Sequence, residues 1–232
     1  MKFTFPVACS SCSCKFSAFG YGENALPPAE CPQCGQQIHF FDHLSISVLA
    51  DRLLFRSQSD IDEGDFTVSI ICSAIAVECA LTQVFLKWKA LDHLVTVGRQ
   101  PTETEQSAHE EEYRKKALGG FEKSANFLSL FLVGEKYDEF VANFIKGSKT
   151  AELIRFGFPQ FESEAKSGHI YAKLFAKRNR IMHWGEMGYD KGDASEGLAA
   201  SATAISVLKA MDHRKNMARE RAWRLSMNNQ PS

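Results

Sequence analysis

The sequence has no excess of charge of either sign, because 27 Lys and Arg residues are offset by 28 Asp and Glu residues, for a net charge of −1. A chain without a basic surplus has no general attraction for nucleic acids or anionic membranes, so bulk charge identifies no partner. The hydrophobic share of 44% and the charged share of 24% are those of an ordinary globular protein.

Long hydrophobic runs are also missing. No window reaches the roughly 18 uncharged apolar residues of a membrane span, and the apolar stretch that begins at Phe66 is interrupted by Glu78 and Lys87. The N-terminal sequence MKFTFPVACSS lacks the apolar segment of a secretory signal, and its single Lys2 makes a poor charged region. We therefore expect a cytoplasmic protein with no membrane partner.

The length of 232 residues suffices for one domain of usual size plus a small appendage, because domains typically hold about 100–150 residues. The character of the sequence changes near residue 42, where a cysteine-rich segment gives way to helical periodicity. We predict a small N-terminal unit at 1–42 and a helical domain at 43–228.

Cysteine is scarce outside the N-terminal segment, since five of the seven cysteines lie within the first 34 residues. Cys9-x2-Cys12 and Cys31-x2-Cys34 are separated by 18 residues, which is the spacing of a four-thiolate zinc site. Because four thiolates leave no position open for water, we expect a structural Zn²⁺ ion rather than a catalytic one. Disulfides are disfavoured in a cytoplasmic chain, and iron in a rubredoxin-like site is the alternative metal.

The register of the two pairs decides which cysteines belong to this site. Each pair is followed, four positions after its second cysteine, by an apolar residue. The match assigns Cys12 rather than Cys14 to the metal and leaves Cys14 as a spare thiol. It also predicts a short β-strand after each pair, at 15–19 and at 38–41.

Beyond residue 42 the apolar periodicity is helical. We predict helices at 43–58, 65–94, 103–118, 120–132, 135–146, 149–156, 162–184 and 193–226. Polar segments with glycine or proline predict connections at 59–64, 97–102 and 185–192. The fold class is therefore mainly α: an up-and-down helical bundle with a small N-terminal zinc ribbon.

One charged residue lies where the helical projection places an apolar face. At about 100° per residue, Arg178 falls in the middle of the apolar face of the helix predicted at 162–184. An isolated buried charge is very costly, so Arg178 requires an acidic partner. Glu78, inside the apolar band of the helix predicted at 65–94, is the candidate. A structural ion pair in the core explains the same pattern without any function.

A second stripe of the same helix holds Ala172, Ala176, Asn179 and His183, spaced i, i+4, i+7 and i+11. The two alanines would let a neighbouring helix approach closely, and Asn179 and His183 would form the floor of a pocket. His183 follows Arg178 by five positions, about 140° around the helix, so the two side chains would converge only at the helix end or across a two-fold axis.

The hexapeptide RNRIMH, from Arg178 to His183, ends a long predicted helix and is followed by a loop and a terminal helix. In this setting it resembles the motif of the HEPN superfamily, in which an Arg, often followed by a polar residue, precedes a His by four to six positions. The resemblance covers roughly 43–226. It implies a homodimeric HEPN-like helical bundle whose motifs from both protomers line one cleft, commonly a metal-independent endoribonuclease active in stress or phage defence.

The resemblance also implies roles for individual residues. His183 would act as general base or acid on the RNA 2′-hydroxyl or the leaving oxygen, because imidazole titrates near neutral pH. Arg178, held by Glu78, would stabilise charge on the scissile phosphate, and Asn179 would orient His183 or donate a hydrogen bond. The expected products carry 2′,3′-cyclic phosphate and 5′-hydroxyl ends. Many family members are inert, so the alternative is a non-catalytic adaptor that dimerises and binds RNA or protein through the zinc ribbon.

The C-terminal helix carries a local basic run on an otherwise neutral chain. Its members are Arg214, Lys215, Arg219, Arg221 and Arg224. RNA phosphates would bind such a run, but a solvated helix end, where cations oppose the negative end of the helix dipole, explains it equally well. The expected partners are RNA, a second copy of the chain and a protein bound by the zinc ribbon.

Overall fold

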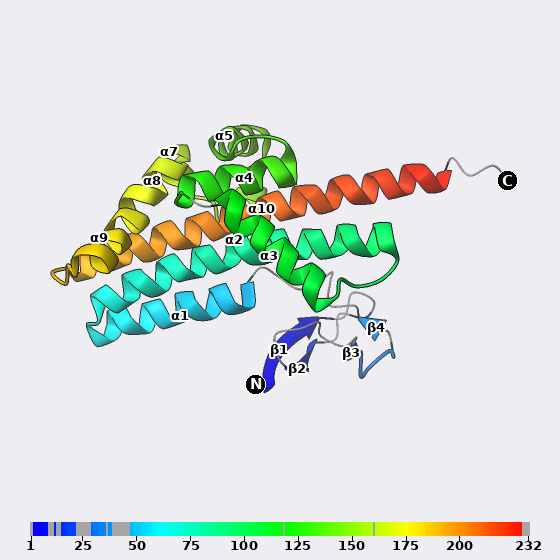
Figure 1. Ribbon diagram of the computed structural model, residues 1–232, viewed down its shortest axis with the longest axis horizontal. Helices are drawn as coiled ribbons and strands as arrows, with labels where there is room; N and C mark the ends of the chain where they lie inside the picture. The colour runs from blue at the N-terminus through cyan, green and yellow to red at the C-terminus, as the bar shows by residue number, and fades with distance from the viewer. Residues whose placement is uncertain are drawn as a thin grey trace. The chain divides into compact units, whose positions relative to one another are not determined.

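The computed structural model describes residues 2–8, 12, 15–21, 29–35, 37–38, 47–117, 119–159 and 161–228 (Figure 1). Helices dominate these residues, as expected of a mainly α protein. The chain divides into two compact units, Met1–Val48 and Leu49–Ser232. The boundary thus lies six residues after the one predicted at residue 42.

Two β-hairpins make up the described part of the N-terminal unit. β1 (Lys2–Ala8) pairs antiparallel with β2 (Lys15–Tyr21), and β3 (Ala29–Glu30) pairs antiparallel with β4 (Gln37–Ile38). Each Cys-x2-Cys sequence therefore falls between two paired strands, which is where a metal-binding knuckle is expected. Of the strand predicted at 38–41, only the first residue lies among the described ones.

The second unit is a bundle of helices, joined by short connections. In chain order the helices are α1 (Ser47–Glu63), α2 (Phe66–Val97), α3 (Glu103–Ala117), α4 (Phe121–Val133), α5 (Tyr137–Gly147), α6 (Thr150–Phe156), α7 (Glu162–Ala165), α8 (Ser167–Ile170), the π-helical turn η2 (Tyr171–Phe175), α9 (Ala176–Trp184) and α10 (Lys191–Asn228). Most bounds lie within a few residues of the predicted ones. Residues 43–46, where the first helix was predicted to start, lie outside the described part of the chain.

α1 continues through the segment where the sequence predicted a connection at 59–64, so that prediction was wrong. Side-chain bonds four residues apart support the last turns of α1: Gln58 donates to Asp62 at 3.0 Å and Ser59 donates to Glu63 at 2.8 Å. The chain reverses direction between α1 and α2 within two residues, Gly64, which has φ of 88°, and the residue after it. Only glycine adopts such a backbone at little cost, so the helix can run up to it.

The two longest helices, α2 and α10, lie side by side and run in the same direction (Figure 1). Near their starts, the Ser201 hydroxyl of α10 donates to the Ser73 carbonyl of α2 at 2.7 Å. Further along both helices, the Trp88 indole donates to Asp212 Oδ1 at 2.7 Å, and the Lys87 ammonium lies 2.9 Å from Asp212 Oδ2. The Asp212 carboxylate thus joins the two helices through two charge-assisted contacts.

By length and composition alone, α2 could cross a membrane. However, 56% of its most apolar window is buried inside the bundle, where Ile70, Val77, Phe85 and Trp88 belong to the core. A central helix of a helical bundle needs the same apolar composition, so the composition of α2 is accounted for by its packing against α10.

Candidate functional site

The helix predicted at 162–184 is interrupted at two points, which sets the position of every residue in the RNRIMH motif. Lys166 is extended (φ −68°, ψ 146°), and Asp138 of α5 accepts hydrogen bonds from the Ser167 amide and hydroxyl at 2.7 and 3.1 Å. After α8, the chain makes the π-helical turn, in which the Ala176 amide donates to the Tyr171 carbonyl five residues earlier. A π-turn holds one more residue than an α-turn, so the register of α9 shifts.

The shift places Lys177, not Arg178, on the buried face of α9, which corrects the projection from the sequence. Lys177 is 8% exposed, whereas the side chain of Arg178 is 27% exposed and that of Glu78 is 45% exposed. The arginine therefore lies at the edge of the bundle rather than in its core. A partly exposed guanidinium can keep an acidic partner and still contact a ligand.

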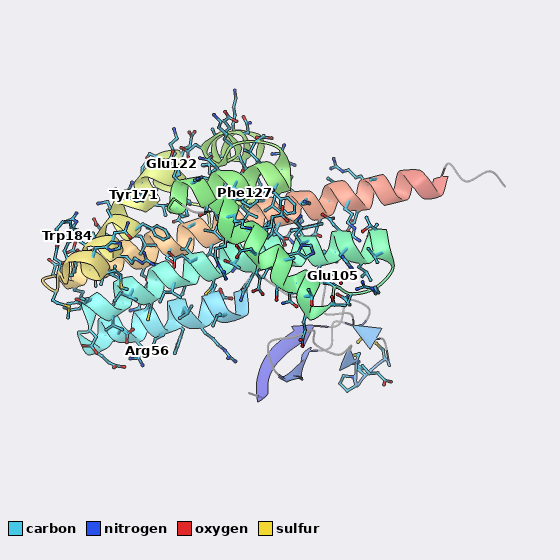
Figure 2. All side chains as sticks on the ribbon, viewed as in Figure 1. Arg56, Glu105, Glu122, Phe127, Tyr171 and Trp184 are labelled. Carbon is cyan, nitrogen blue, oxygen red and sulfur yellow. The ribbon has the colours of Figure 1, made fainter. Side chains whose placement is uncertain are left out.

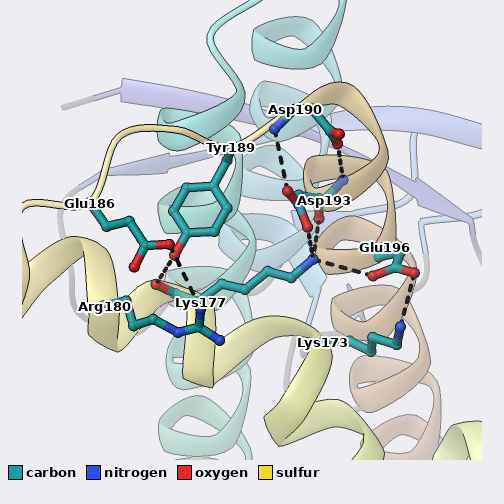
Figure 3. Close-up of polar contacts among 8 residues, drawn as sticks. All are labelled: Lys173, Lys177, Arg180, Glu186, Tyr189, Asp190, Asp193 and Glu196. Carbon is teal, nitrogen blue, oxygen red and sulfur yellow. Dashed lines mark hydrogen bonds and ion pairs between the residues drawn. The ribbon is translucent and has the colours of Figure 1, made fainter.

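Lys177 is held by two acidic residues of α10 (Figure 3). Its ammonium lies 2.7 Å from Asp193 Oδ1 and 3.2 Å from Glu196 Oε2, and it also donates to the Asp193 carbonyl at 3.2 Å. The hydrogen bond from Lys177 lowers the pKa of Asp193, and hydrogen bonds from Lys173 and Lys177 lower the pKa of Glu196. This cluster fastens α9 to the start of α10.

Arg178 and Glu78 are in contact, as the sequence predicted for the two charges on apolar faces. Arg178 Nη2 lies 3.3 Å from Glu78 Oε1 and 3.5 Å from Oε2. The other terminal nitrogen, Nη1, donates to Asn179 Oδ1 at 3.1 Å. The Asn179 side chain thus accepts a hydrogen bond from Arg178, whereas the resemblance implied that it would orient His183 or donate a hydrogen bond.

A groove of ≈ 510 Å³ borders this trio. Its walls come from α2, α3, α4 and the segment from η2 to α9, and its charged lining consists of Glu78, Glu110, Arg114 and Arg178. Tyr113, Phe121, Tyr171 and Phe175 supply aromatic lining. A groove with two guanidiniums and several aromatic rings offers both charged and stacking contacts to a ligand.

His183 does not line this groove. It is exposed on the last turn of α9, and it has no hydrogen bond or ion pair with any residue that the structure describes. Its neighbours Met182, Trp184 and Met187 are also exposed, and Trp184 is 83% exposed at the tip of the helix (Figure 2). Within one chain, the structure brings together Glu78, Arg178 and Asn179 but not His183.

Three thiols of the N-terminal unit form a second candidate site. The sulfur atoms of Cys12, Cys31 and Cys34 all lie within 4.8 Å of one another, and Cys12 Sγ is 3.6 Å from Cys31 Sγ. Zinc–sulfur bonds of about 2.3 Å in a tetrahedron separate the sulfur atoms by about 3.8 Å, so this spacing fits a zinc ion. Cys9 and Cys14 lie outside the described residues.

The backbone around Cys31 favours its thiolate form. Burial opposes ionisation, but hydrogen bonds from the amides of Gln33 and Cys34 and from the Cys12 and Cys34 thiols outweigh it and lower the Cys31 pKa to about 6. The knuckle closes where the Gly35 amide donates to the Cys31 carbonyl at 2.9 Å, with Gly35 at φ 69°. A thiolate that accepts amide hydrogen bonds is the arrangement a metal ligand requires.

Acidic oxygens of Asp60, Glu63 and Asp65 also lie within 4.8 Å of one another, at the turn between α1 and α2. The guanidinium of Arg56 already lies 2.6 Å from Asp60 Oδ1. An arginine in this position neutralises the carboxylate that a cation would need, so this cluster is accounted for as an ion pair.

Comparison of the chain with protein-family models, curated proteins and solved structures finds no match. Function must therefore be argued from the geometry of the residues.

The sequence did not reveal the cluster around Lys177, although a signal was present. Lys173 and Lys177 are four residues apart, and Asp193 and Glu196 are three residues apart on the next helix, so each pair shares one helix face. In addition, Asp190 and Asp193 have the spacing of a reciprocal helix cap, and the Asp193 amide donates to Asp190 Oδ1 at 2.9 Å. Reading the two patterns together would have paired α9 with the start of α10.

Proposed function

We propose that this protein is a HEPN-like, metal-independent endoribonuclease that acts as a homodimer. The single observation that carries the proposal is the guanidinium of Arg178, which Glu78 and Asn179 hold at the edge of a groove large enough for a nucleotide. A fixed arginine at such an edge can stabilise the charge that develops on a scissile phosphate. The resemblance of the RNRIMH motif to the HEPN superfamily supports the same site.

In this proposal His183 comes from the second copy of the chain. The histidine lies on an exposed helix end beside Met182, Trp184 and Met187, and exposed apolar side chains that cluster commonly mark an interface. Pairing two such ends about a two-fold axis would bury the tryptophans and bring each histidine toward the arginine of the other chain. The site would then be incomplete in a monomer.

The reaction needs only acid–base and electrostatic contributions. His183 would remove the proton of the RNA 2′-hydroxyl, and the oxygen would attack the adjacent phosphorus while Arg178 neutralises the phosphoryl oxygens. The bond from phosphorus to the 5′-oxygen breaks, and that oxygen takes up a proton from water, while the proton on His183 returns to the solvent. The products carry a 2′,3′-cyclic phosphate and a 5′-hydroxyl, and no redox partner is involved.

The proposal is tested by incubating the full-length protein with a mixed RNA pool in EDTA. Wild-type protein should cut the RNA to cyclic-phosphate ends, whereas His183→Ala and Arg178→Ala should lose at least about 100-fold in rate, as is usual for a general base or a charge-stabilising group. Arg180→Ala is the matched control, because Arg180 belongs to the same motif but is exposed and pairs with Glu186 at 3.7 Å. Intact RNA in every sample, or an equal loss with Arg180→Ala, would refute the nuclease.

A second candidate function, a non-catalytic adaptor, is favoured by one observation: His183 is absent from the groove that Arg178 lines. In this reading the Arg178 pair holds α2 against α9, and the exposed end around Trp184 dimerises the protein. Dimerisation with RNA binding but without cleavage would support the adaptor. Analytical ultracentrifugation of Trp184→Ala separates dimerisation from chemistry, because Trp184 takes no part in the proposed reaction.

We also propose that Cys9, Cys12, Cys31 and Cys34 hold a structural Zn²⁺ ion in a zinc ribbon that recognises RNA or a protein. Four thiolates would fill the coordination of the metal, which then supplies folding stability rather than catalysis. Substitution of Co²⁺ should give thiolate absorption that Cys12→Ser abolishes and Cys14→Ser retains. Loss of the signal with Cys14→Ser would overturn the assigned ligand set, and elemental analysis separates zinc from iron.

A further inference from the structure

A second pocket, of ≈ 480 Å³, lies where α10 packs against α5 and α6, and it shares no lining residue with the groove of Arg178. One face of α10 forms its wall with Arg214, Met217, Ala218 and Arg221, which are spaced i, i+3, i+4 and i+7. Ala218 of α10 and Gly147 of α5, which carry little or no side chain, also line the pocket, and a Cβ added at Gly147 would meet no atom within 4 Å.

The structure divides the basic run of α10 into residues with different environments. Lys215 turns toward the bundle, where its ammonium donates to the Phe131 carbonyl at 3.1 Å and lies 3.9 Å from the Phe131 ring centroid. Burial lowers the pKa of Lys215. Arg214 and Arg221 instead line the pocket, and Arg219 is exposed and does not line it.

Arg214 is held in place at the pocket wall. Its Nη2 atom lies 3.3 Å from Glu135 Oε1, and its guanidinium lies 5.6 Å from the Phe140 ring centroid. The same carboxylate accepts a hydrogen bond from Asn143 Nδ2 at 2.9 Å through its other oxygen, so Glu135 fixes two residues of the pocket. A guanidinium has five N–H donors, and one contact to Glu135 leaves donors for an anion.

The other charges around the pocket also favour an anion. Arg221 is exposed and makes no hydrogen bond or ion pair with any residue in the described part of the chain. Among the described residues that line the pocket, Glu152 is the one acidic residue, and His213 and Ser148 add groups that can donate hydrogen bonds. Arg214 and Arg221 are seven residues apart, about 10 Å along the helix axis, so their long side chains can contact one ligand.

We propose that this pocket binds a nucleotide, with a phosphate held between Arg214 and Arg221 and the attached sugar or base against Met217 and Ala218. Two guanidiniums suit the geometry of a phosphate, and the apolar wall between them suits a larger organic body. The volume is within the range of small-molecule sites. This inference goes beyond the proposed nuclease, because none of these residues belongs to the Arg178 groove.

The test measures binding of two probes to the full-length protein. ADP binding is measured by calorimetry. Binding of a short, fluorescently labelled single-stranded 2′-O-methyl RNA is measured by anisotropy; this RNA cannot be cleaved, because its 2′-hydroxyl groups are methylated. The variants are Arg214→Gln, Arg221→Gln and, as matched control, Arg219→Gln, which removes the same charge from another face of α10. Arg214→Gln also loses the contact with Glu135 and could therefore be destabilised, whereas Arg221→Gln breaks no such contact among the residues that the structure describes and tests the pocket by itself. Thermal unfolding checks that each variant is folded.

We expect Arg214→Gln and Arg221→Gln each to weaken binding by about tenfold or more, and Arg219→Gln to change it by less than about twofold. If ADP shows this pattern, the ligand is a free nucleotide; if only the oligonucleotide shows it, the phosphate comes from RNA. An equal loss with Arg219→Gln would mean general electrostatic attraction and overturn the proposal. Absence of binding of both probes to the wild type would overturn it as well.

Discussion

Substitutions at the two ends of the Lys177 cluster test how this ion pair contributes to stability. Lys177→Met replaces a buried ammonium by an apolar side chain of similar length. The double substitution Asp193→Asn with Glu196→Gln instead keeps the ammonium and removes the charges of its partners. Because burial differs between the two ends, the structure predicts unequal losses in the free energy of unfolding.

The magnitudes follow from exposure. Lys177 is 8% exposed, whereas the side chains of Asp193 and Glu196 are 36% and 49% exposed. Carboxylates that lose Lys177 can turn to water, so Lys177→Met should change stability by no more than about 1 kcal/mol. An ammonium that loses both carboxylates stays in a poorly hydrated site with neutral acceptors only, namely the backbone carbonyl of residue 193 at 3.2 Å and the amide oxygens of the substituted side chains. We expect a loss of about 2–3 kcal/mol, somewhat below the roughly 3–5 kcal/mol found for fully buried pairs.

Urea denaturation measures both losses, provided that the dependence of free energy on urea is the same in each variant. Equal losses at the two ends, or a larger loss for Lys177→Met, would refute the reasoning. Acid provides an independent measurement. The folded-state pKa values of Asp193 and Glu196 are lowered from ordinary values of 3.8 and 4.5, so their contribution is present above those values and is lost as pH falls below them. Wild-type stability should therefore fall more steeply below about pH 4.5 than that of Lys177→Met.

Two further pairs of substitutions test the stability of the bundle. Asp212→Ala should lower the free energy of unfolding by about 3–5 kcal/mol, because it leaves the Lys87 ammonium and the Trp88 indole without their shared acceptor. Asp212→Asn should lose less, since its side chain keeps one oxygen. Equal free energies of unfolding for the two variants would contradict this. Gly134→Ala should lose about 1–2 kcal/mol in thermal unfolding, because Gly134 has φ of 76°, whereas Gly147→Ala, at a helical glycine with open space around it, should be neutral or stabilising.

The helices of the bundle were predictable because their apolar residues recur at a helical period over long segments. α2 and α10 were expected at 65–94 and 193–226, and the structure has them at Phe66–Val97 and Lys191–Asn228. The contact between Glu78 and Arg178 was predictable for a different reason. In the sequence, each charge projects onto the apolar band of its helix, and the cost of an isolated buried charge paired the two. The structure keeps this contact but places it at the edge of the bundle, where the side chains of Arg178 and Glu78 are 27% and 45% exposed.

What could not be predicted depends on contacts between distant segments or on local departures from α geometry. The break before α8 depends on Asp138, which accepts hydrogen bonds from Ser167 across 29 positions of sequence. No residue close to Ser167 in the sequence indicates that Asp138 will be its acceptor. The projection of Arg178 into the core failed because it assumed the α period from residue 162 to residue 184, while the π-turn inserts one residue into that period.

Deletion of Ala172 tests this last point directly. Ala172 is an exposed residue of the π-turn, and its removal would place the Tyr171 carbonyl four residues before the Ala176 amide, the spacing of an ordinary α-turn. The helices on both sides could then keep their packing, so we expect a cooperatively folded protein that retains the Arg178 contact with Glu78.

Deletion of Ala202, an exposed alanine inside the regular part of α10, is the control. It would rotate one half of that helix by about 100° relative to the other and turn Ala200 or Ala204 out of the core, at a cost comparable to the whole stability of a domain, about 5–15 kcal/mol. Circular dichroism and urea unfolding compare the two deletions. If deletion of Ala172 unfolds the protein as completely as deletion of Ala202, the extra residue is required by the packing of η2, and the register shift at Lys177 is not a simple one-residue insertion.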